Sequence, residues 1–155
     1  MNPRKERNIV LALALAEADS ATFETVWSLV FGTKTQWHGL LEKAAVSVNG
    51  FSEERFPLEK SPTSNGVNEV PFPMECKNGK DAVSKMVSVH NFVGPGSALL
   101  YIATRESKCL KLVISGCTWN GEDGHTYVAV YDRLSSSIYL ELIDELDSSY
   151  TFLVR

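Results

Sequence analysis

The sequence predicts an α+β fold, in which N-terminal helices pack on a C-terminal antiparallel β-meander of about five strands. Two observations lead to this class. Apolar residues recur every three or four positions before residue 50, whereas β-branched and aromatic residues separated by short turns dominate after residue 97. With 155 residues, the chain has the usual length of one domain. We therefore expect a single domain over residues 1–155.

The helical part is predicted to cover residues 3–50 as three helices. Pro3 suits the first turn of a helix that runs to about residue 18, and the polar residues 19–22 can cap a second helix that ends at Gly32. A third helix is predicted between Thr35 and Gly50, because one helical face there carries Trp37, Leu40, Leu41, Ala44, Ala45 and Val48.

The middle of the chain, residues 51–80, has a different composition, because it contains four of the six prolines among Ser, Asn, Glu and Gly. It is predicted to be irregular, as a functional loop or with an edge strand near Val67 to Phe72. Asp81 can cap a short helix over residues 81–92, which Gly94-Pro95-Gly96 would end as a turn.

The β-meander is predicted to occupy residues 97–155, with strands at 97–104, 109–118, 126–133, 138–144 and 150–154. The short connections predict antiparallel neighbours. Alternation places Leu112, Ile114 and Leu140 on a face that packs on the helices. The opposite face is partly apolar, so it is either covered by the helices and the Pro-rich segment or is a docking surface.

Charge and cysteine content limit the partners and the compartment. The net charge is −4, and the 15 Lys and Arg residues form no stripe that could follow phosphates, so nucleic acid is not an expected partner. The composition does not indicate a membrane protein either. Cys76, Cys109 and Cys117 are odd in number and lack C-x-x-C spacing, which favours a reducing, cytoplasmic location over a disulfide framework.

Residues 1–18 allow a different localisation. Basic residues at positions 4, 5 and 7 precede an apolar run from Ile9 to Ala16, which is the outline of a secretory signal. The chain would then be secreted. We favour a cytoplasmic helix, because the run is only eight residues long and is rich in the strong helix formers Ala and Leu.

The densest polar cluster, residues 119–125, lies between the predicted strands 109–118 and 126–133. His125 as general base and Cys117 as nucleophile are candidate catalytic residues, since they flank the same loop. A hairpin turn explains the cluster more simply, because Asn-Gly and Asp-Gly accept positive φ angles without any function. No spacing predicts a metal site or a cofactor, and Gly94-Pro95-Gly96 lacks the remainder of a phosphate-binding loop.

The acidic residues of the meander suggest a function in protein binding. A negative patch at residues 141–147, joined by Glu122 and Asp123, would attract a basic surface on another protein. We therefore expect a small acidic cytoplasmic module without catalytic activity, such as an inhibitor, immunity-type or adaptor protein. The candidate binding residues are Trp119, Glu122, Asp123, His125, Tyr139 and Glu141.

A small-molecule pocket, in a ligand carrier or an enzyme, is the alternative function. The order of helices, irregular segment, helix and strands is similar to the cone-shaped NTF2-like architecture, whose curved sheet encloses a pocket against its helices; the similarity covers element order only. In such a pocket the strands would supply the aromatic and titratable residues Tyr101, Tyr127, Tyr131, His125 and Cys117.

Overall fold

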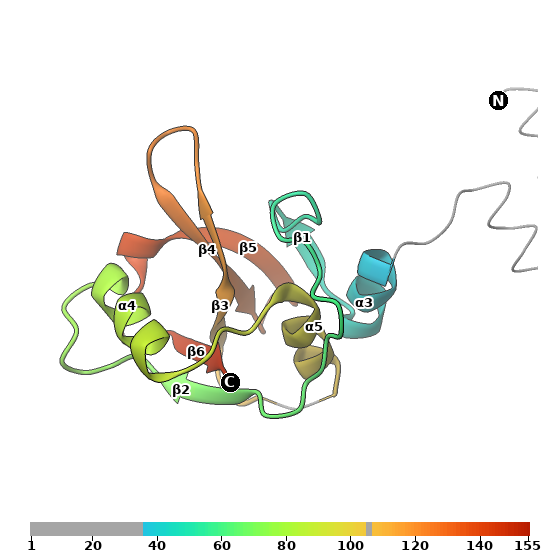
Figure 1. Ribbon diagram of the computed structural model, residues 1–155, viewed down its shortest axis with the longest axis horizontal. Helices are drawn as coiled ribbons and strands as arrows, with labels where there is room; N and C mark the ends of the chain where they lie inside the picture. Colours follow the sequence, from blue (N-terminus) through green and yellow to red (C-terminus); the bar gives the residue numbers. More distant parts are fainter. Residues whose placement is uncertain (1–35, 105–106) are drawn as a thin grey trace, which may run out of the picture. The chain divides into compact units, whose positions relative to one another are not determined.

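The computed structural model describes residues 36–104 and 107–155 of a chain that divides into two units, Met1–His38 and Gly39–Arg155. The two helices predicted before residue 35 and the signal-like segment 1–18 lie outside the described residues, and the single-domain prediction stays a prediction. Within Gly39–Arg155, helices accompany one β-sheet (Figure 1). The α+β class is therefore confirmed.

The sheet has six strands and is mixed rather than antiparallel, with the order β1-β5-β4-β3-β6-β2. Strand β1 pairs parallel with β5, and β6 pairs parallel with β3, while the other neighbours are antiparallel. In chain order the strands are β1 (Ser47–Asn49), β2 (Asn68–Pro71), β3 (Lys111–Asn120), β4 (Thr126–Asp132), β5 (Ser137–Leu142) and β6 (Thr151–Val154).

The prediction of a continuous meander is therefore wrong after β5. A short 3-10 helix, η1 (Ile143–Glu145), and the turn behind it carry the chain past β4 and β3, so that β6 lies between β3 and β2. Phe152, Leu153 and Val154 are all buried, and such an uninterrupted apolar run is typical of a strand covered on both faces.

The strand predicted at residues 97–104 is helix α5 (Pro95–Thr104). Gly94-Pro95-Gly96 begins this helix instead of forming only a turn, with proline at the first helical position. The Glu59 carboxylate accepts hydrogen bonds from the Gly96 and Ser97 backbone N–H groups, at 2.8 and 2.9 Å, and from the Ser97 hydroxyl. This cap comes from a residue far away in the sequence, so no local pattern indicated it.

Two other helices differ from the prediction at their ends. Helix α3 (Gln36–Ala44) stops where Ala45 adopts a φ angle of 55°, and Val48 belongs to β1. Helix α4 (Gly79–Val89) begins earlier than predicted, because Asn78 rather than Asp81 is its cap: the Asn78 side chain accepts the Asp81 N–H at 2.9 Å. The predicted edge strand near residues 67–72 is confirmed as β2.

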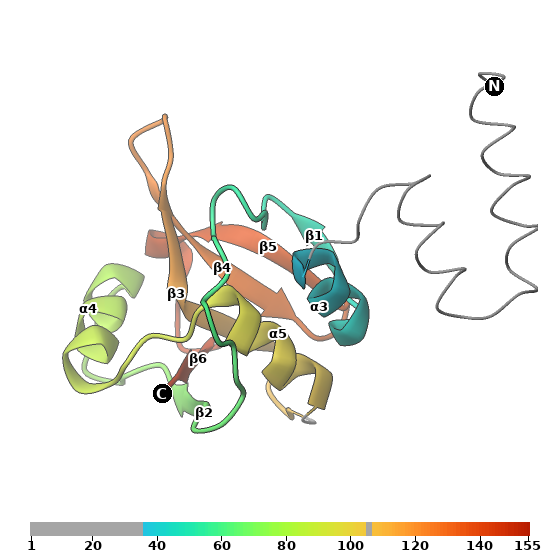
Figure 2. The same ribbon diagram turned by 45° about the vertical axis from the view of Figure 1, so that its right-hand side comes forward.

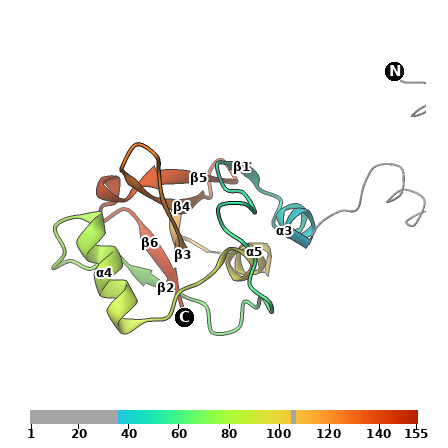
Figure 3. The ribbon, with the colours of Figure 1, turned by 45° about the horizontal axis from the view of Figure 1, so that its top comes forward.

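Both faces of the central strands are covered. Ala82 and Met86 of α4 pack in one cluster with Val113, Val130 and other residues of that face, so the face predicted to be partly apolar is covered by α4. Leu112, Ile114, Ala129 and Leu153, which alternate with these residues, are also buried, and α5 packs against β3. Figure 3 shows β3 and β6 passing between the two helices.

The hairpin of β3 and β4 extends beyond the covered part of the sheet (Figures 1 and 2). Its register changes within β3, because Val113 pairs with Val130 whereas Thr118 pairs with Val128. The extra residues bulge toward the segment before α5, where the Gly116 N–H donates to the Val93 carbonyl at 2.9 Å. Beyond this bulge the two strands pair again through Trp119 and Tyr127, outside the core.

Candidate functional site

The tip of the projecting hairpin is a tight turn built by two glycines. Gly121 and His125 face one another, with the Gly121 N–H donating to the His125 carbonyl at 2.8 Å, and Glu122, Asp123 and Gly124 form the three-residue loop. Gly124 has a φ angle of 82°, which a side chain would disfavour. This geometry matches a turn followed by a left-handed glycine, so the Asp-Gly pair is explained by the turn, as the simpler interpretation predicted.

Asp123 connects the turn to the strand behind it. One carboxylate oxygen accepts the His125 backbone N–H at 3.0 Å, and the other accepts the Tyr127 hydroxyl. The Tyr127 hydrogen bond is the main cause that lowers the pKa of Asp123, and the same bond raises the pKa of Tyr127. The Asp123 carboxylate is therefore ionised at neutral pH and fixed in position beside an aromatic ring.

Trp119 and Tyr127 form the aromatic wall of an open groove of about 510 Å³ at the base of this tip. They are directly paired in the hairpin, and their ring centroids lie 6.1 Å apart with an interplanar angle of 41°. The guanidinium carbon of Arg55 lies 4.3 Å from the centre of the Trp119 ring. The remaining lining residues are Gly121, Glu122, Asp123 and Leu140.

Arg55 reaches the groove from a short loop whose backbone is held by two buried phenylalanines. Phe51 and Phe56 are 1% and 4% exposed, and their ring centroids lie 5.6 Å apart. Within this loop, the Arg55 guanidinium donates to the Gly50 carbonyl at 3.1 Å. Sequence reasoning missed Arg55, because no pattern in residues 51–80 indicates which strand end the loop approaches.

The structure brings three of the six candidate binding residues, Trp119, Glu122 and Asp123, to this groove. His125 borders another open cavity, of about 290 Å³, together with Lys80 of α4 and Asp144 of η1. The hairpin tip is thus near one acidic residue of the 141–147 segment through His125, whereas Glu122 and Asp123 line the other groove. The lysine in the same lining makes that cavity less negative than a purely acidic patch.

Tyr139 and Glu141 lie on the opposite face of the sheet from Trp119, since they pair with Val130 and Val128. There the Tyr150 hydroxyl donates to Glu141 at 3.4 Å, and the Lys111 ammonium lies 5.1 Å from the centre of the Tyr150 ring. Burial and the Glu141 charge raise the pKa of Tyr150 to about 12, although Lys111 acts against them. These residues form a separate cluster beside α4.

Cys117 lies in the bulged part of β3 and is completely buried. Burial, and to a lesser extent the charge of Glu59, raises the pKa of its thiol well above the ordinary value, which disfavours the nucleophilic thiolate at neutral pH. His125 is exposed, and Cys117 does not line the cavity that His125 borders. The pairing of Cys117 with His125 stays a prediction that no contact between them supports.

The tyrosines of the alternative pocket hypothesis are also dispersed. Tyr101 of α5 donates its hydroxyl to Glu69 of β2 at 2.6 Å, whereas Tyr127 lies in the projecting hairpin. Tyr131 pairs with Leu112 at the other end of β4. The three side chains therefore do not line one common cavity with Cys117 and His125.

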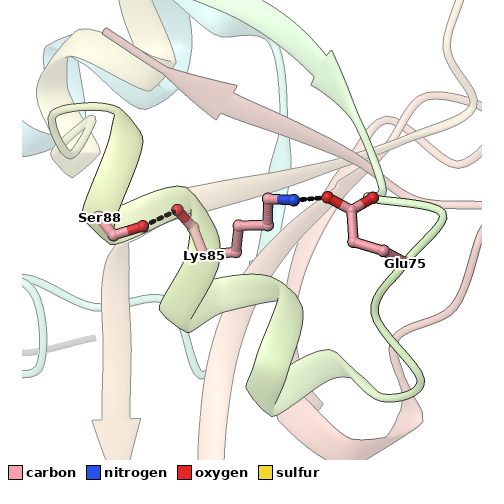
Figure 4. A network of polar contacts seen from close by, with 3 residues as sticks. All are labelled: Glu75, Lys85 and Ser88. Carbon is pink, nitrogen blue, oxygen red and sulfur yellow. Dashed lines mark hydrogen bonds and ion pairs between the residues drawn. The ribbon is translucent and has the colours of Figure 1, made fainter.

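Another groove, of about 230 Å³, lies between α4 and the segment at and after β2. The Lys85 ammonium forms an ion pair with the Glu75 carboxylate across it, and the Ser88 hydroxyl donates to the Lys85 carbonyl at 2.7 Å (Figure 4). Most of its other lining is apolar, including Val70, Met86 and Val89. The ion pair joins the two walls and makes this groove part of the packing of α4.

Among residues 36–104 and 107–155, no group of three or more His, Cys, Asp and Glu side chains could hold a metal ion. Helices long and apolar enough to cross a bilayer are likewise absent from this part of the chain.

Comparison of the chain with protein-family models, with curated proteins and with solved structures finds no match.

Proposed function

We propose that this protein is a binding module that recognises another protein through the groove formed by Arg55, Trp119, Tyr127 and Asp123. The observation that carries the proposal is that a half-buried tryptophan and tyrosine of the projecting hairpin line one open groove together with an exposed arginine from a separate loop. Trp, Tyr and Arg are the residues that most often dominate the energy of protein interfaces, especially when they cluster in one pocket.

Charge favours a partner with a basic surface. Glu122 and Asp123 stand at the tip of the hairpin, and Glu53 and Glu54 are exposed on the loop that carries Arg55. Such carboxylates increase the rate at which a positively charged protein associates, more than they increase affinity. An inhibitor, an immunity-type protein or an adaptor would need a surface of this kind and no catalytic group.

A reducing, cytoplasmic location suits the proposal. Cys76, Cys109 and Cys117 are all free cysteines, and Cys117 is packed in the core as a small apolar side chain. The fold therefore does not depend on an oxidising compartment.

Affinity capture from native cell extract tests the proposal when it is combined with matched variants of the bait. The wild-type chain, Trp119→Ala and Leu134→Ala would be compared; Leu134 is 79% exposed in the turn at the other end of β4. We expect a stoichiometric partner that is retained by wild type and Leu134→Ala, and at least tenfold weaker binding to Trp119→Ala in a subsequent titration.

The salt dependence of association gives an independent measurement. The association rate constant should fall as the ionic strength rises, because added salt screens the hairpin carboxylates. Equal binding by Trp119→Ala and wild type would contradict the proposal. So would the absence of a protein partner together with a small molecule that raises the melting temperature, which would favour the alternative ligand-binding function.

A further inference from the structure

The guanidinium group of Arg55 covers the face of the Trp119 ring and makes few other contacts. Its guanidinium carbon lies 4.3 Å from the ring centre, and one hydrogen bond, to the Gly50 carbonyl, holds the group in place. Arg55 is itself exposed to solvent. A guanidinium is planar and weakly hydrated, so an aromatic face is a favourable place for it to stack.

The carboxylates of the same groove are not neutralised by Arg55. In the part of the chain that the structure describes, neither Glu122 nor Asp123 forms an ion pair, even though both line the groove with Arg55. Asp123 is instead oriented by the Tyr127 hydroxyl and the His125 N–H. The groove thus contains two carboxylates that can accept hydrogen bonds from an additional cation.

The Arg55 side chain can leave the groove without unfolding its loop. Phe51 and Phe56 fix the loop backbone in the core, and the Phe56 N–H donates to the Ser52 carbonyl at 2.9 Å. Only the exposed side chain would need to rotate. The open volume of about 510 Å³ is large enough for an entering guanidinium.

We infer that the groove binds an arginine side chain of the partner protein, which displaces Arg55 from Trp119 and pairs with Asp123 and Glu122. This inference rests on the proposed function, since it names the chemical group that the partner inserts. In the free protein, Arg55 occupies the aromatic face as an internal competitor. This competitor shields the open face of the half-buried Trp119 ring from non-specific contacts, and it lowers the affinity for weak ligands.

The test uses small probes and the whole 155-residue chain. N-acetyl-arginine methylamide would be titrated while the indole N–H signal of Trp119 is followed by NMR, with N-acetyl-citrulline methylamide as the uncharged analogue. We expect a saturable shift in the millimolar range for the arginine probe and none for citrulline. N-acetyl-trimethyllysine methylamide distinguishes a guanidinium site from a site for any cation, and tighter binding of this probe would overturn the inference.

Arg55→Ala decides whether Arg55 competes with the ligand. Removing a competing cation–π contact at an exposed site should tighten binding of the arginine probe about two- to fivefold. Lys60→Ala is the matched control, because it removes the same charge from an exposed position nearby in the sequence and should leave the affinity unchanged. Asp123→Asn should weaken binding, because it removes the negative charge of an acceptor.

An unchanged or weaker affinity in Arg55→Ala would overturn the inference, as would the absence of any saturable shift with the arginine probe. These failures differ from failure of the proposed function. If the partner still depends on Trp119 while the probe does not bind, the groove recognises a protein by other groups. If the partner is indifferent to Trp119, the proposed function itself is wrong.

Discussion

Tyr127 shows how one residue links the strand register to the charge of the groove. Its ring packs beside Trp119 because the two residues are directly paired, and its hydroxyl holds Asp123 in the orientation that lines the groove. Gly121 makes this arrangement possible, because a Cβ atom there would lie 2.6 Å from the Asp123 carboxylate and 2.9 Å from the Tyr127 ring. The shape and charge of the groove therefore depend on the Tyr127–Asp123 hydrogen bond and on the absence of a side chain at Gly121.

Tyr127→Phe should raise the pKa of Asp123 toward its ordinary value, because the mutation removes the main hydrogen bond that favours the carboxylate. The ring remains, so the Trp119 contact and the fold should persist. Carboxyl NMR titration measures the shift, with Tyr131→Phe as the control that leaves Asp123 unchanged. An Asp123 pKa that does not move in Tyr127→Phe would show that the hydroxyl is not its partner in solution.

The raised pKa of Tyr150 predicts that the folded protein loses stability at alkaline pH. This pKa is raised to about 12 in the folded protein, and an unfolded tyrosine titrates near pH 10. The folded state therefore binds this proton more tightly. The contribution to stability is complete below about pH 10 and is lost as the pH rises toward 12. Urea unfolding between pH 9 and 12 checks this, and Tyr150→Phe should show a weaker dependence on pH over that window.

At the scale of elements, close backbone contacts decide where the helices and the hairpin can lie. The bulge in β3 lets Gly116 approach the segment before α5, and the Ser115 hydroxyl accepts the Val93 N–H at 3.0 Å beside it. A Cβ atom at Gly116 would lie 2.4 Å from the Val93 carbonyl oxygen, which is backbone and cannot rotate away. The bulge thus fixes the start of α5 against the strand that carries Trp119.

Gly116→Ala is expected to destabilise the fold by about 2 kcal/mol or more, since overpacking against backbone forces a shift of the main chain. Gly39→Ala is the matched control: it lies in α3, a Cβ atom there meets nothing within 4 Å, and alanine should stabilise the helix by up to about 1 kcal/mol. Denaturant unfolding measures both. Equal stability of the two variants would show that the bulge can relax.

At the scale of the whole unit Gly39–Arg155, the last strand joins the edge strand β2 to the rest of the sheet. β6 pairs parallel with β3 on one side and antiparallel with β2 on the other. Phe152 is completely buried in the cluster beneath α4, where its ring centroid lies 6.2 Å from that of Phe72. Residues from the end of the described chain are therefore part of the centre of the fold.

Phe152→Ala should lower the free energy of unfolding by about 3–5 kcal/mol, the usual cost of removing a buried phenylalanine. Phe92→Ala, at a position 52% exposed, should cost much less and serves as the control. Thermal and urea unfolding measure the difference. A Phe152→Ala variant as stable as Phe92→Ala would contradict the central position of β6.

Local patterns in the sequence determined the α+β class and the hairpin turn at Asp123-Gly124, and they named three residues of the groove as candidates. They left the strand β2 open as one of two alternatives for its segment. Periodicity and turn residues report such features because they act over a few positions. Contacts between distant segments decided the rest: the parallel position of β6, the helix α5 capped by Glu59, and the Arg55 guanidinium on Trp119. Residues 95–104 are apolar enough for either a strand or a buried helix, and the cap by the Glu59 carboxylate and the packing on β3 favour the helix.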